Sequence, residues 1–127
     1  MLEKQCTIWA GTLPFNDDKS FLDYIEEKYD SGGDYIPSEF LKSFDIDRID
    51  RDDLEWDYTI NPLPFEDFLD GFSYFETFKE NAIKNAEKQQ IKNVNLIVIA
   101  YEYKYSGKIK CNKGVHLVGV FKYLESQ

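Results

Sequence analysis

The sequence predicts an α+β fold, in which helices cover one face of a small, mostly antiparallel sheet. Three features support this prediction: an N-terminal strand opens the chain, several amphipathic helical segments follow it, and two or more apolar strands close it. The 127 residues suit a single core, and no repeat or linker divides them. We therefore expect residues 1–127 to form one domain.

The first strand is predicted over residues 5–11, which are rich in β-branched and aromatic side chains and end in glycine. Asn16 or Asp17 offers an N-cap for a helix through Lys28, because apolar residues follow at spacings of three and four. The SGGD sequence at residues 31–34 is expected to end this helix, since glycine readily adopts positive φ.

The middle of the chain is predicted to be less regular. Ser38 is the expected N-cap of a short helix, and an irregular acidic segment follows over residues 45–57. The WDYTI sequence at residues 56–60 predicts a short strand, and the NPLP sequence at residues 61–64 predicts a rigid turn. Residues 65–69 then predict one or two helical turns.

The C-terminal half is predicted to contain one long helix and at least two strands. Ser73 is the expected cap of a helix that runs to about Gln90, with Glu76 completing a capping box. Residues 93–104 predict a long strand with a nearly continuous apolar centre, after which Tyr101, Tyr103 and Tyr105 are expected to alternate onto one face. Residues 115–124 predict the last strand.

The chain is acidic, with a formal net charge of −9 and a sequence pI of about 4.6. The charge is uneven, since residues 17–70 hold 18 acidic and 5 basic side chains, whereas residues 79–127 hold 4 acidic and 9 basic ones. Nucleic acid and anionic membranes repel such a chain, so its natural macromolecular partner is a basic protein surface. Its hydrophobic content of 43% is too high for a disordered chain.

Two cysteines, Cys6 and Cys111, are too few for the disulfide framework that is typical of a small secreted scaffold. The N-terminus shows no signal peptide, and the longest strongly apolar run, VNLIVIAY, is too short to span a bilayer. These features predict a cytoplasmic protein with reduced thiols.

The candidate binding site is the segment DIDRIDRDDLEWD at residues 45–57, in which seven of thirteen residues are carboxylates and only two are basic. Such a concentration of charge opposes folding through self-repulsion, which indicates a role in docking. The predicted partner-binding acids are Asp45, Asp47, Asp50, Asp52, Asp53, Glu55 and Asp57, with Asp30 and Asp34 as secondary contacts. The predicted aromatic anchors at the edge of this region are Tyr35, Trp56 and Tyr58.

Other interpretations of the same acids stay open. An EF-hand is excluded, because loops that start at Asp45 or Asp50 lack both the glycine at position 6 and the glutamate at position 12. A calcium- or magnesium-binding protein of another kind, a general mimic of double-stranded DNA, and a solvated acidic loop without a partner are the three alternatives.

Enzymatic activity is not expected. The single histidine, His116, lies inside an apolar strand pattern, and nothing marks it or Cys111 as activated. The sequence contains no phosphate-binding, serine hydrolase or zinc protease motif, and it has too few Cys and His residues for a zinc site. We therefore predict no catalytic residues, no cofactor and no dedicated metal site.

An ordered set of short motifs spans nearly the whole chain: IWAG at residues 8–11, IPSEF at 36–40, the acidic segment, GFSYFETF at 71–78 and LVGVFKY at 117–123. This set resembles the immunity protein 22 family of bacterial polymorphic toxin systems. The resemblance implies a small cytoplasmic protein, encoded beside a toxin, that binds this toxin and protects the producing cell. Toxins of such systems are often nucleases, and the resemblance assigns no catalytic residues.

The resemblance also locates individual residues within the family's motifs. Trp9 and Gly11 match its early tryptophan segment, and Ser73 and Tyr74 match its Gly-Phe-Ser-Tyr part. The residues that fall in its acidic segment are Asp50, Asp53 and Glu55. We assign Trp9, Tyr74 and Tyr123 to folding, because aromatic residues on strands and at helix starts usually lie in the core.

The sequence therefore predicts an immunity protein that neutralises a cognate toxin through an acidic surface. A nuclease must present Lys and Arg to phosphates, and a carboxylate cluster can occupy those positions. The predicted partner is this toxin, with a basic active-site surface, and not nucleic acid or a membrane. Occlusion of the active site and binding at a neighbouring exosite are both compatible with the sequence, as are a monomer and a small homo-oligomer.

Overall fold

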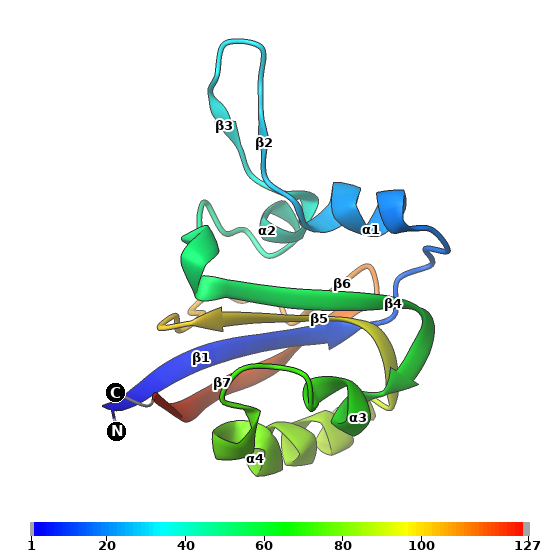
Figure 1. Ribbon diagram of the computed structural model, residues 1–127, viewed down its shortest axis with the longest axis vertical. Coiled ribbons are helices and arrows are strands. Elements are labelled where there is room, and N and C mark those ends of the chain that lie inside the picture. Colours follow the sequence, from blue (N-terminus) through cyan, green and yellow to red (C-terminus); the bar gives the residue numbers. More distant parts are fainter. Residues whose placement is uncertain (1, 126–127) are drawn as a thin grey trace.

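Five antiparallel strands form the main sheet of the computed structural model, which describes residues 2–125 (Figure 1). Their order across the sheet is β4-β5-β1-β7-β6, so the N-terminal strand lies at the centre. The α+β class and the antiparallel sheet predicted from the sequence are confirmed. The strands are β1 (Leu2–Gly11), β4 (Leu54–Pro64), β5 (Asn93–Tyr101), β6 (Cys111–Asn112) and β7 (Val115–Glu125).

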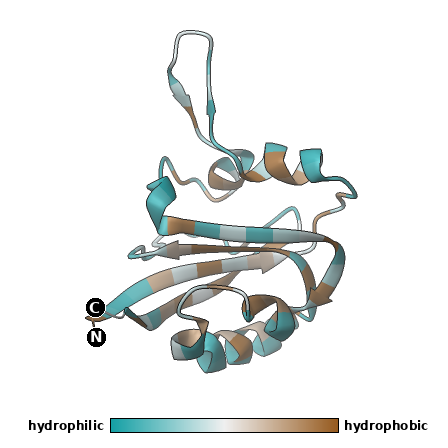
Figure 2. Ribbon diagram, in the orientation of Figure 1, coloured by the Kyte–Doolittle hydropathy of each residue, from teal (hydrophilic) through white to brown (hydrophobic). Residues whose placement is uncertain are grey.

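Helices cover both faces of this sheet, and the prediction that they cover only one face is wrong (Figure 1). The physical reason is visible in β5, where residues 94–100 are all buried. A nearly continuous apolar strand is typical of a sheet that is covered on both sides, and Figure 2 shows β5 as a strongly hydrophobic ribbon. The helices are α1 (Asp18–Ile25) and α2 (Glu39–Ser43) on one face, and α3 (Phe65–Leu69) and α4 (Phe75–Lys88) on the other.

Alternation along β1 divides the core into two hydrophobic clusters. Ile8 packs with the cluster under α3 and α4, whereas Trp9 packs with the cluster under α1 and α2. At the centre of the sheet, Ile8 pairs with Ile99 of β5 and with Gly119 of β7. The register between β1 and β7 shifts directly after this pair, at a position where Gly119 has a φ of 153° that favours glycine.

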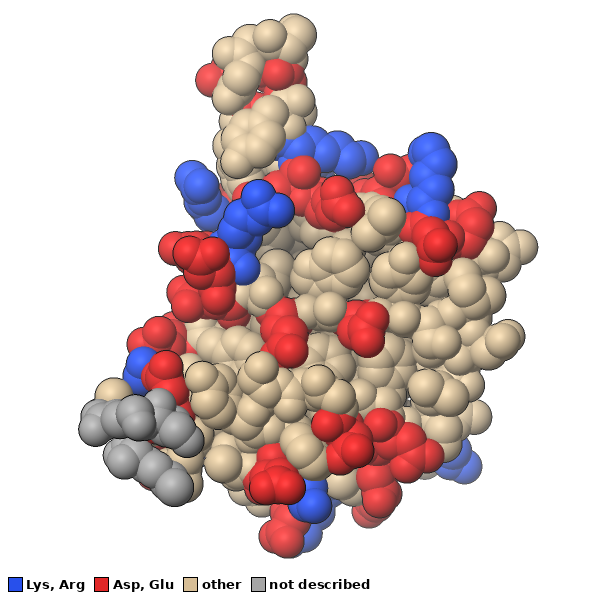
Figure 3. Space-filling model, in the orientation of Figure 1, with Lys and Arg blue, Asp and Glu red and all other residues tan. Residues whose placement is uncertain are grey.

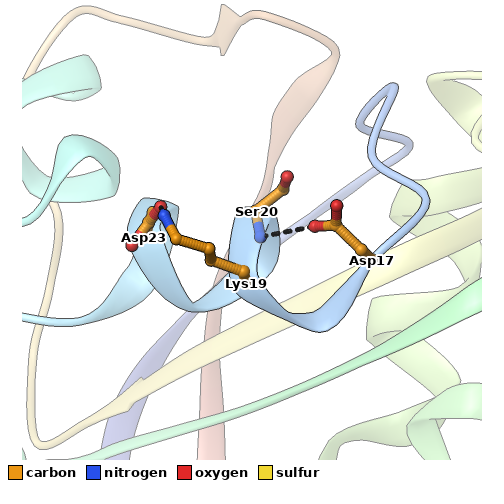
Figure 4. A network of polar contacts seen from close by, with 4 residues as sticks. All are labelled: Asp17, Lys19, Ser20 and Asp23. Atoms are coloured by element: carbon orange, nitrogen blue, oxygen red, sulfur yellow. Dashed lines mark hydrogen bonds and ion pairs between the residues drawn. The ribbon is translucent and has the colours of Figure 1, made fainter.

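α1 begins at a predicted cap but ends earlier than predicted. The Asp17 Oδ1 atom accepts a hydrogen bond from the Ser20 N–H at 2.8 Å, and Lys19 pairs with Asp23 at 2.7 Å (Figure 4). Hydrogen bonding to Ser20 lowers the pKa of Asp17. The helix ends at Ile25, so the segment that follows is free to form a different structure.

A hairpin follows α1, and the prediction that SGGD ends a helix is wrong. β2 (Lys28–Tyr29) and β3 (Tyr35–Ile36) pair with each other and project from the body of the molecule (Figure 1). The Asp30 N–H donates to the Asp34 carbonyl at 2.9 Å, and Gly33 has a φ of 86° in the turn between them. Positive φ at glycine therefore serves a turn between strands instead of a helix C-cap.

The segment between α2 and α3 is more regular than predicted. Ser38 is the N-cap of α2 as predicted, since its Oγ accepts a hydrogen bond from the Leu41 N–H at 3.1 Å. The 3₁₀ helix η1 (Arg51–Asp53) leads into β4, which continues through residues 61–64, so the rigid turn predicted there is wrong. The pairing of β4 with β5 shifts register after Tyr58, and prolines are tolerated because β4 is an edge strand.

α3 occupies the predicted residues, but the predicted cap of α4 is wrong. Tyr74, with a φ of 59°, stands at the N-cap in place of Ser73, and its carbonyl accepts a hydrogen bond from the Thr77 hydroxyl at 2.8 Å. The Ser73 N–H donates to Glu55 Oε1 of β4 at 3.1 Å. A tertiary contact therefore fixes the start of α4, where the sequence predicts a local capping box.

β5 ends at Tyr101, and the prediction that three alternating tyrosines share one face is wrong. Glu102 has a φ of 53°, which interrupts the strand. Tyr101 packs with the cluster under α3 and α4, whereas Tyr103 and Tyr105 pack with the opposite cluster. The buried Tyr105 hydroxyl donates to the Phe44 carbonyl at 2.9 Å and ties the loop after β5 to the end of α2.

Candidate functional site

The acidic segment at residues 45–57 runs from the end of α2 through η1 into β4. Ile46 and Ile49 are buried and attach this loop to the core. The Asp50 Oδ1 atom accepts a hydrogen bond from the Asp52 N–H at 3.0 Å and caps η1. The exposed acidic residues of the loop are Asp45, Asp47, Asp50 and Asp52.

β4 places its acids and its aromatic rings on opposite faces of the sheet. Tyr58 stacks on Phe21 of α1 with ring centroids 4.5 Å apart, and its hydroxyl donates to Asp18 at 2.9 Å. Trp56 stacks beside Tyr58, so both predicted anchors take part in packing. Glu55 lies on the other face, because successive strand residues alternate.

The predicted contacts Asp30, Asp34 and Tyr35 lie on the projecting hairpin of β2 and β3, apart from η1 (Figure 1). The Asp30 side chain accepts hydrogen bonds within the turn, and the Arg48 guanidinium lies 4.9 Å from the centre of the Tyr35 ring. These three residues therefore form a second group on the hairpin, which contacts the segment of residues 45–57 through Arg48.

A hollow of about 350 Å³ opens where η1, β4, the end of β5 and the end of β7 meet. Figure 3 shows acidic side chains gathered over η1 and the start of β4, with basic side chains beside the base of the hairpin. The rings of Tyr74, Tyr101 and Tyr123 line the hollow and pack against one another with centroids 5.3–5.6 Å apart. We call it the acidic hollow, because its lining contains the carboxylates of Asp52, Asp53, Glu55, Glu102 and Glu125.

Lys4 of β1 lies beside these acids and only partly neutralises them. Its Nζ forms ion pairs with Glu125 and, at 3.1 Å, with Glu102. Hydrogen bonds to Glu125 and Glu102 raise the pKa of Lys4, which therefore stays charged. Burial raises the pKa of Asp53, and the charges of Asp50 and Glu102 add to this effect, as expected where like charges crowd together.

Of the five carboxylates that line the hollow, the sequence predicted Asp52, Asp53 and Glu55 as binding residues but not Glu102 and Glu125. The missed residues lie far along the chain and reach the hollow because β1 pairs with both β5 and β7. A carboxylate directly after a long apolar strand, as in the AYEY sequence, is the only local signal that points to Glu102. Tyr123 is buried as predicted, whereas Tyr74 is partly exposed in the lining of the hollow.

A metal site and a Cys–His pair are the two other kinds of site that the sequence raises. Within residues 2–125, no group of three or more His, Cys, Asp or Glu side chains is arranged to hold a metal ion. Cys111 and His116 face each other across β6 and β7, with the Sγ and Nε2 atoms 3.9 Å apart. This pair lies at the opposite end of β7 from Glu125 and takes no part in the acidic hollow.

A protein-family model described as Immunity protein 22 matches residues 6–124 of the chain. The chain belongs to this family. The resemblance noted in the sequence is thereby confirmed, and membership in the immunity protein 22 family places the chain among proteins with a toxin-neutralising role. No curated protein and no solved structure matches this family member. None of its helices in the described range 2–125 is long and apolar enough to cross a bilayer.

Proposed function

We propose that this immunity protein neutralises its cognate toxin by docking the acidic hollow against a surface rich in Lys and Arg. Family membership supports the neutralising role. The observation that carries the proposed surface is the convergence of five carboxylates, from three separate stretches of the chain, around one hollow. The exposed acids that extend this negative surface are Asp45, Asp47 and Asp50 in the preceding loop and Asp57 on β4.

A nuclease that acts in the cytoplasm is the toxin class that fits this surface best. Such an enzyme presents Lys and Arg side chains to phosphates, and closely spaced carboxylates are complementary to them. Charge complementarity of this kind accelerates association with the partner, and this acceleration falls as salt screens the charges. The immunity protein needs no catalytic residue, cofactor or direct contact with nucleic acid for this role.

The test reverses charge on the surface without removing contacts that hold the fold. Asp47→Lys, Asp52→Lys and Asp53→Lys are combined, because these side chains lie on the loop and η1. Glu55 and Glu125 are left unchanged, since they bond to Tyr101 and Lys4. We expect association with the toxin domain encoded beside this chain, measured by stopped-flow at low salt, to slow at least about tenfold and to lose most of its salt dependence.

The matched control carries the same charge change on the α3–α4 face. Glu66→Lys, Glu80→Lys and Glu87→Lys replace three exposed acids there. This variant is expected to associate within about threefold of the unmodified protein, since screening limits the effect of distant charges. Equal slowing of both variants would show that only the net charge matters, and unchanged association of the folded loop variant would rule out the acidic hollow as the docking surface.

A further inference from the structure

The hairpin of β2 and β3 carries the most exposed large aromatic side chain among residues 2–125. Tyr29 is 60% exposed, and it stands on an element that projects beyond α1 and α2 (Figure 1). A tyrosine on a projecting element gains little from folding, because it buries little apolar area against its own chain. Tyrosine is also among the residue types that contribute most to protein–protein binding. The position of Tyr29 is therefore better explained by contact with a partner than by packing.

Several contacts hold this hairpin in one shape although its strands are short. The Asp30 Oδ1 atom accepts hydrogen bonds from the N–H groups of Gly32 at 2.8 Å and Asp34 at 2.9 Å. The rings of Tyr29 and Tyr35 meet edge to face with centroids 6.1 Å apart. An isolated two-stranded hairpin is marginally stable, so these contacts organise it before any partner arrives. A preorganised element loses less conformational entropy when it binds.

The charges on and around the hairpin indicate what kind of surface it can meet. Its turn carries Asp30 and Asp34, and Glu26 and Glu27 lie directly before β2. Lys28 is the only basic residue of the hairpin itself. The face of the hairpin in Figure 3 accordingly shows uncharged and acidic atoms, and basic atoms begin at its base. A partner surface that receives the hairpin is therefore expected to be basic.

Hollows at the base of the hairpin connect it to the acidic hollow. One hollow of about 570 Å³ is lined by Tyr29, Arg48 and Asp52, among others. Asp52 also lines the acidic hollow, so the two depressions adjoin each other at this residue. A partner that covers both must be concave around the hairpin, because the hairpin stands above the surface on which the hollows lie.

We infer that the projecting hairpin inserts into a cleft lined by Lys and Arg on the toxin, with Tyr29 as the buried anchor. Asp30 and Asp34 face the basic groups of this cleft, and the acidic hollow contacts its outer rim. This inference rests on the proposed function and adds to it the shape of the partner and the element that enters it. Insertion into such a cleft blocks access of an anionic substrate directly.

Two hairpin variants test the anchor and the charges separately. Tyr29→Ala removes an exposed ring, and we expect it to raise the Kd for the toxin domain encoded beside this chain at least about 30-fold. Asp30→Asn combined with Asp34→Asn removes both charges. It keeps a side-chain carbonyl at position 30, where Asp30 accepts the turn hydrogen bonds, and it is expected to slow association. Leu63→Ala is the matched control, because Leu63 is 44% exposed at the far end of β4 and its removal should leave the Kd unchanged.

A cross-linking experiment locates the hairpin in the complex. Ser31→Cys, in a Cys111→Ser background, carries a benzophenone maleimide at the exposed turn. Photolysis of the complex should attach this group to toxin peptides that line its active-site cleft. If the unmodified protein does not bind the toxin, the proposed function fails together with this inference. If it binds, and the Tyr29→Ala variant binds equally or the cross-links map to a convex outer surface, only the inference about the hairpin is overturned.

Discussion

The Tyr101 hydroxyl donates a hydrogen bond to Glu55 Oε1 at 2.6 Å and thereby connects the fold to the acidic hollow. The same hydroxyl lies 2.9 Å from the Ser73 carbonyl, and Glu55 also accepts the Ser73 N–H. Burial and the neighbouring Glu55 raise the pKa of Tyr101 well above its usual range, so the hydroxyl keeps the proton that it donates. Of the five hollow carboxylates, Glu55 therefore has a fixed position that depends on β5 and on the start of α4.

Replacement of Tyr101 by phenylalanine should destabilise the protein while it leaves the core filled. The variant leaves the half-buried Glu55 carboxylate with only the Ser73 N–H as donor and leaves the Ser73 carbonyl without the Tyr101 hydroxyl, which is expected to lower the free energy of unfolding by about 1–2 kcal/mol. Urea denaturation followed by circular dichroism measures this change. Tyr103→Phe is the matched control, because the hydrogen bonds that Tyr103 makes within residues 2–125 come from its backbone: its carbonyl accepts the Thr7 hydroxyl, and its N–H donates to the Gln5 carbonyl. Equal losses in both variants would contradict a special role for the Tyr101 hydroxyl.

The parts of the fold that the sequence predicted correctly are those with strong local signals. The apolar runs of β1, β5 and β7 and the N-cap at Ser38 depend on side chains within a few residues. The boundaries predicted from glycine at residues 31–34 and from proline at residues 61–64 are wrong. The backbone preferences of glycine suit a helix end as well as a hairpin turn, and those of proline suit a turn as well as an edge strand. Coverage of both sheet faces was implied by the unbroken apolar centre of β5, but the one-face prediction did not take this run into account.

The candidate site was predictable only where its residues are neighbours in the sequence. Asp52, Asp53 and Glu55 follow one another along the chain, whereas Glu125 reaches the hollow through its pairing with Leu2. Strand register is set by contacts between distant segments, and no local pattern specifies it here. The aromatic residues Trp56 and Tyr58 look like exposed anchors in the sequence, because the stacking of Phe21 on Tyr58 depends on the position of α1.

Substitution of Gly11 by alanine is expected to disrupt the sheet, since there is no room for a side chain at this position. A Cβ atom on Gly11 would lie 2.6 Å from the Val115 Cα and would press against the Gly114 carbonyl, both of which are backbone. We expect a loss of about 3 kcal/mol in the free energy of unfolding, measured by urea denaturation. Gly71→Ala is the control, because its nearest neighbour would be 4.0 Å away, and it should stay within about 1 kcal/mol of the parent. A tolerated Gly11→Ala would show that β1 and β7 can move apart at little cost.

Replacement of Trp9 by phenylalanine should destabilise the protein less than its replacement by alanine. It is fully buried and meets Phe40 edge to face at 5.0 Å, so Trp9→Ala is expected to lower the free energy of unfolding by about 3–5 kcal/mol. Its indole N–H has no hydrogen-bond partner in the described part of the chain. Trp9→Phe removes this unsatisfied donor and keeps most of the apolar contact, so we expect less than half of that loss. Both free energies of unfolding are measured by denaturation with circular dichroism. An equal loss in Trp9→Ala and Trp9→Phe would show that the apolar contact of the ring is not what stabilises this site.

The two cysteines should differ sharply in reactivity in the native protein. Cys6 is fully buried in the central strand, and burial raises the pKa of its thiol to about 12, so almost no thiolate forms at pH 8. Cys111 is exposed at the edge of the sheet. A disulfide reagent such as dithionitrobenzoate at pH 8 should therefore modify one thiol rapidly in the folded protein and both after denaturation. The Cys111→Ser variant should show no rapid phase. A rapid phase that persists in this variant would mean that β1 opens to solvent far more often than a central strand should.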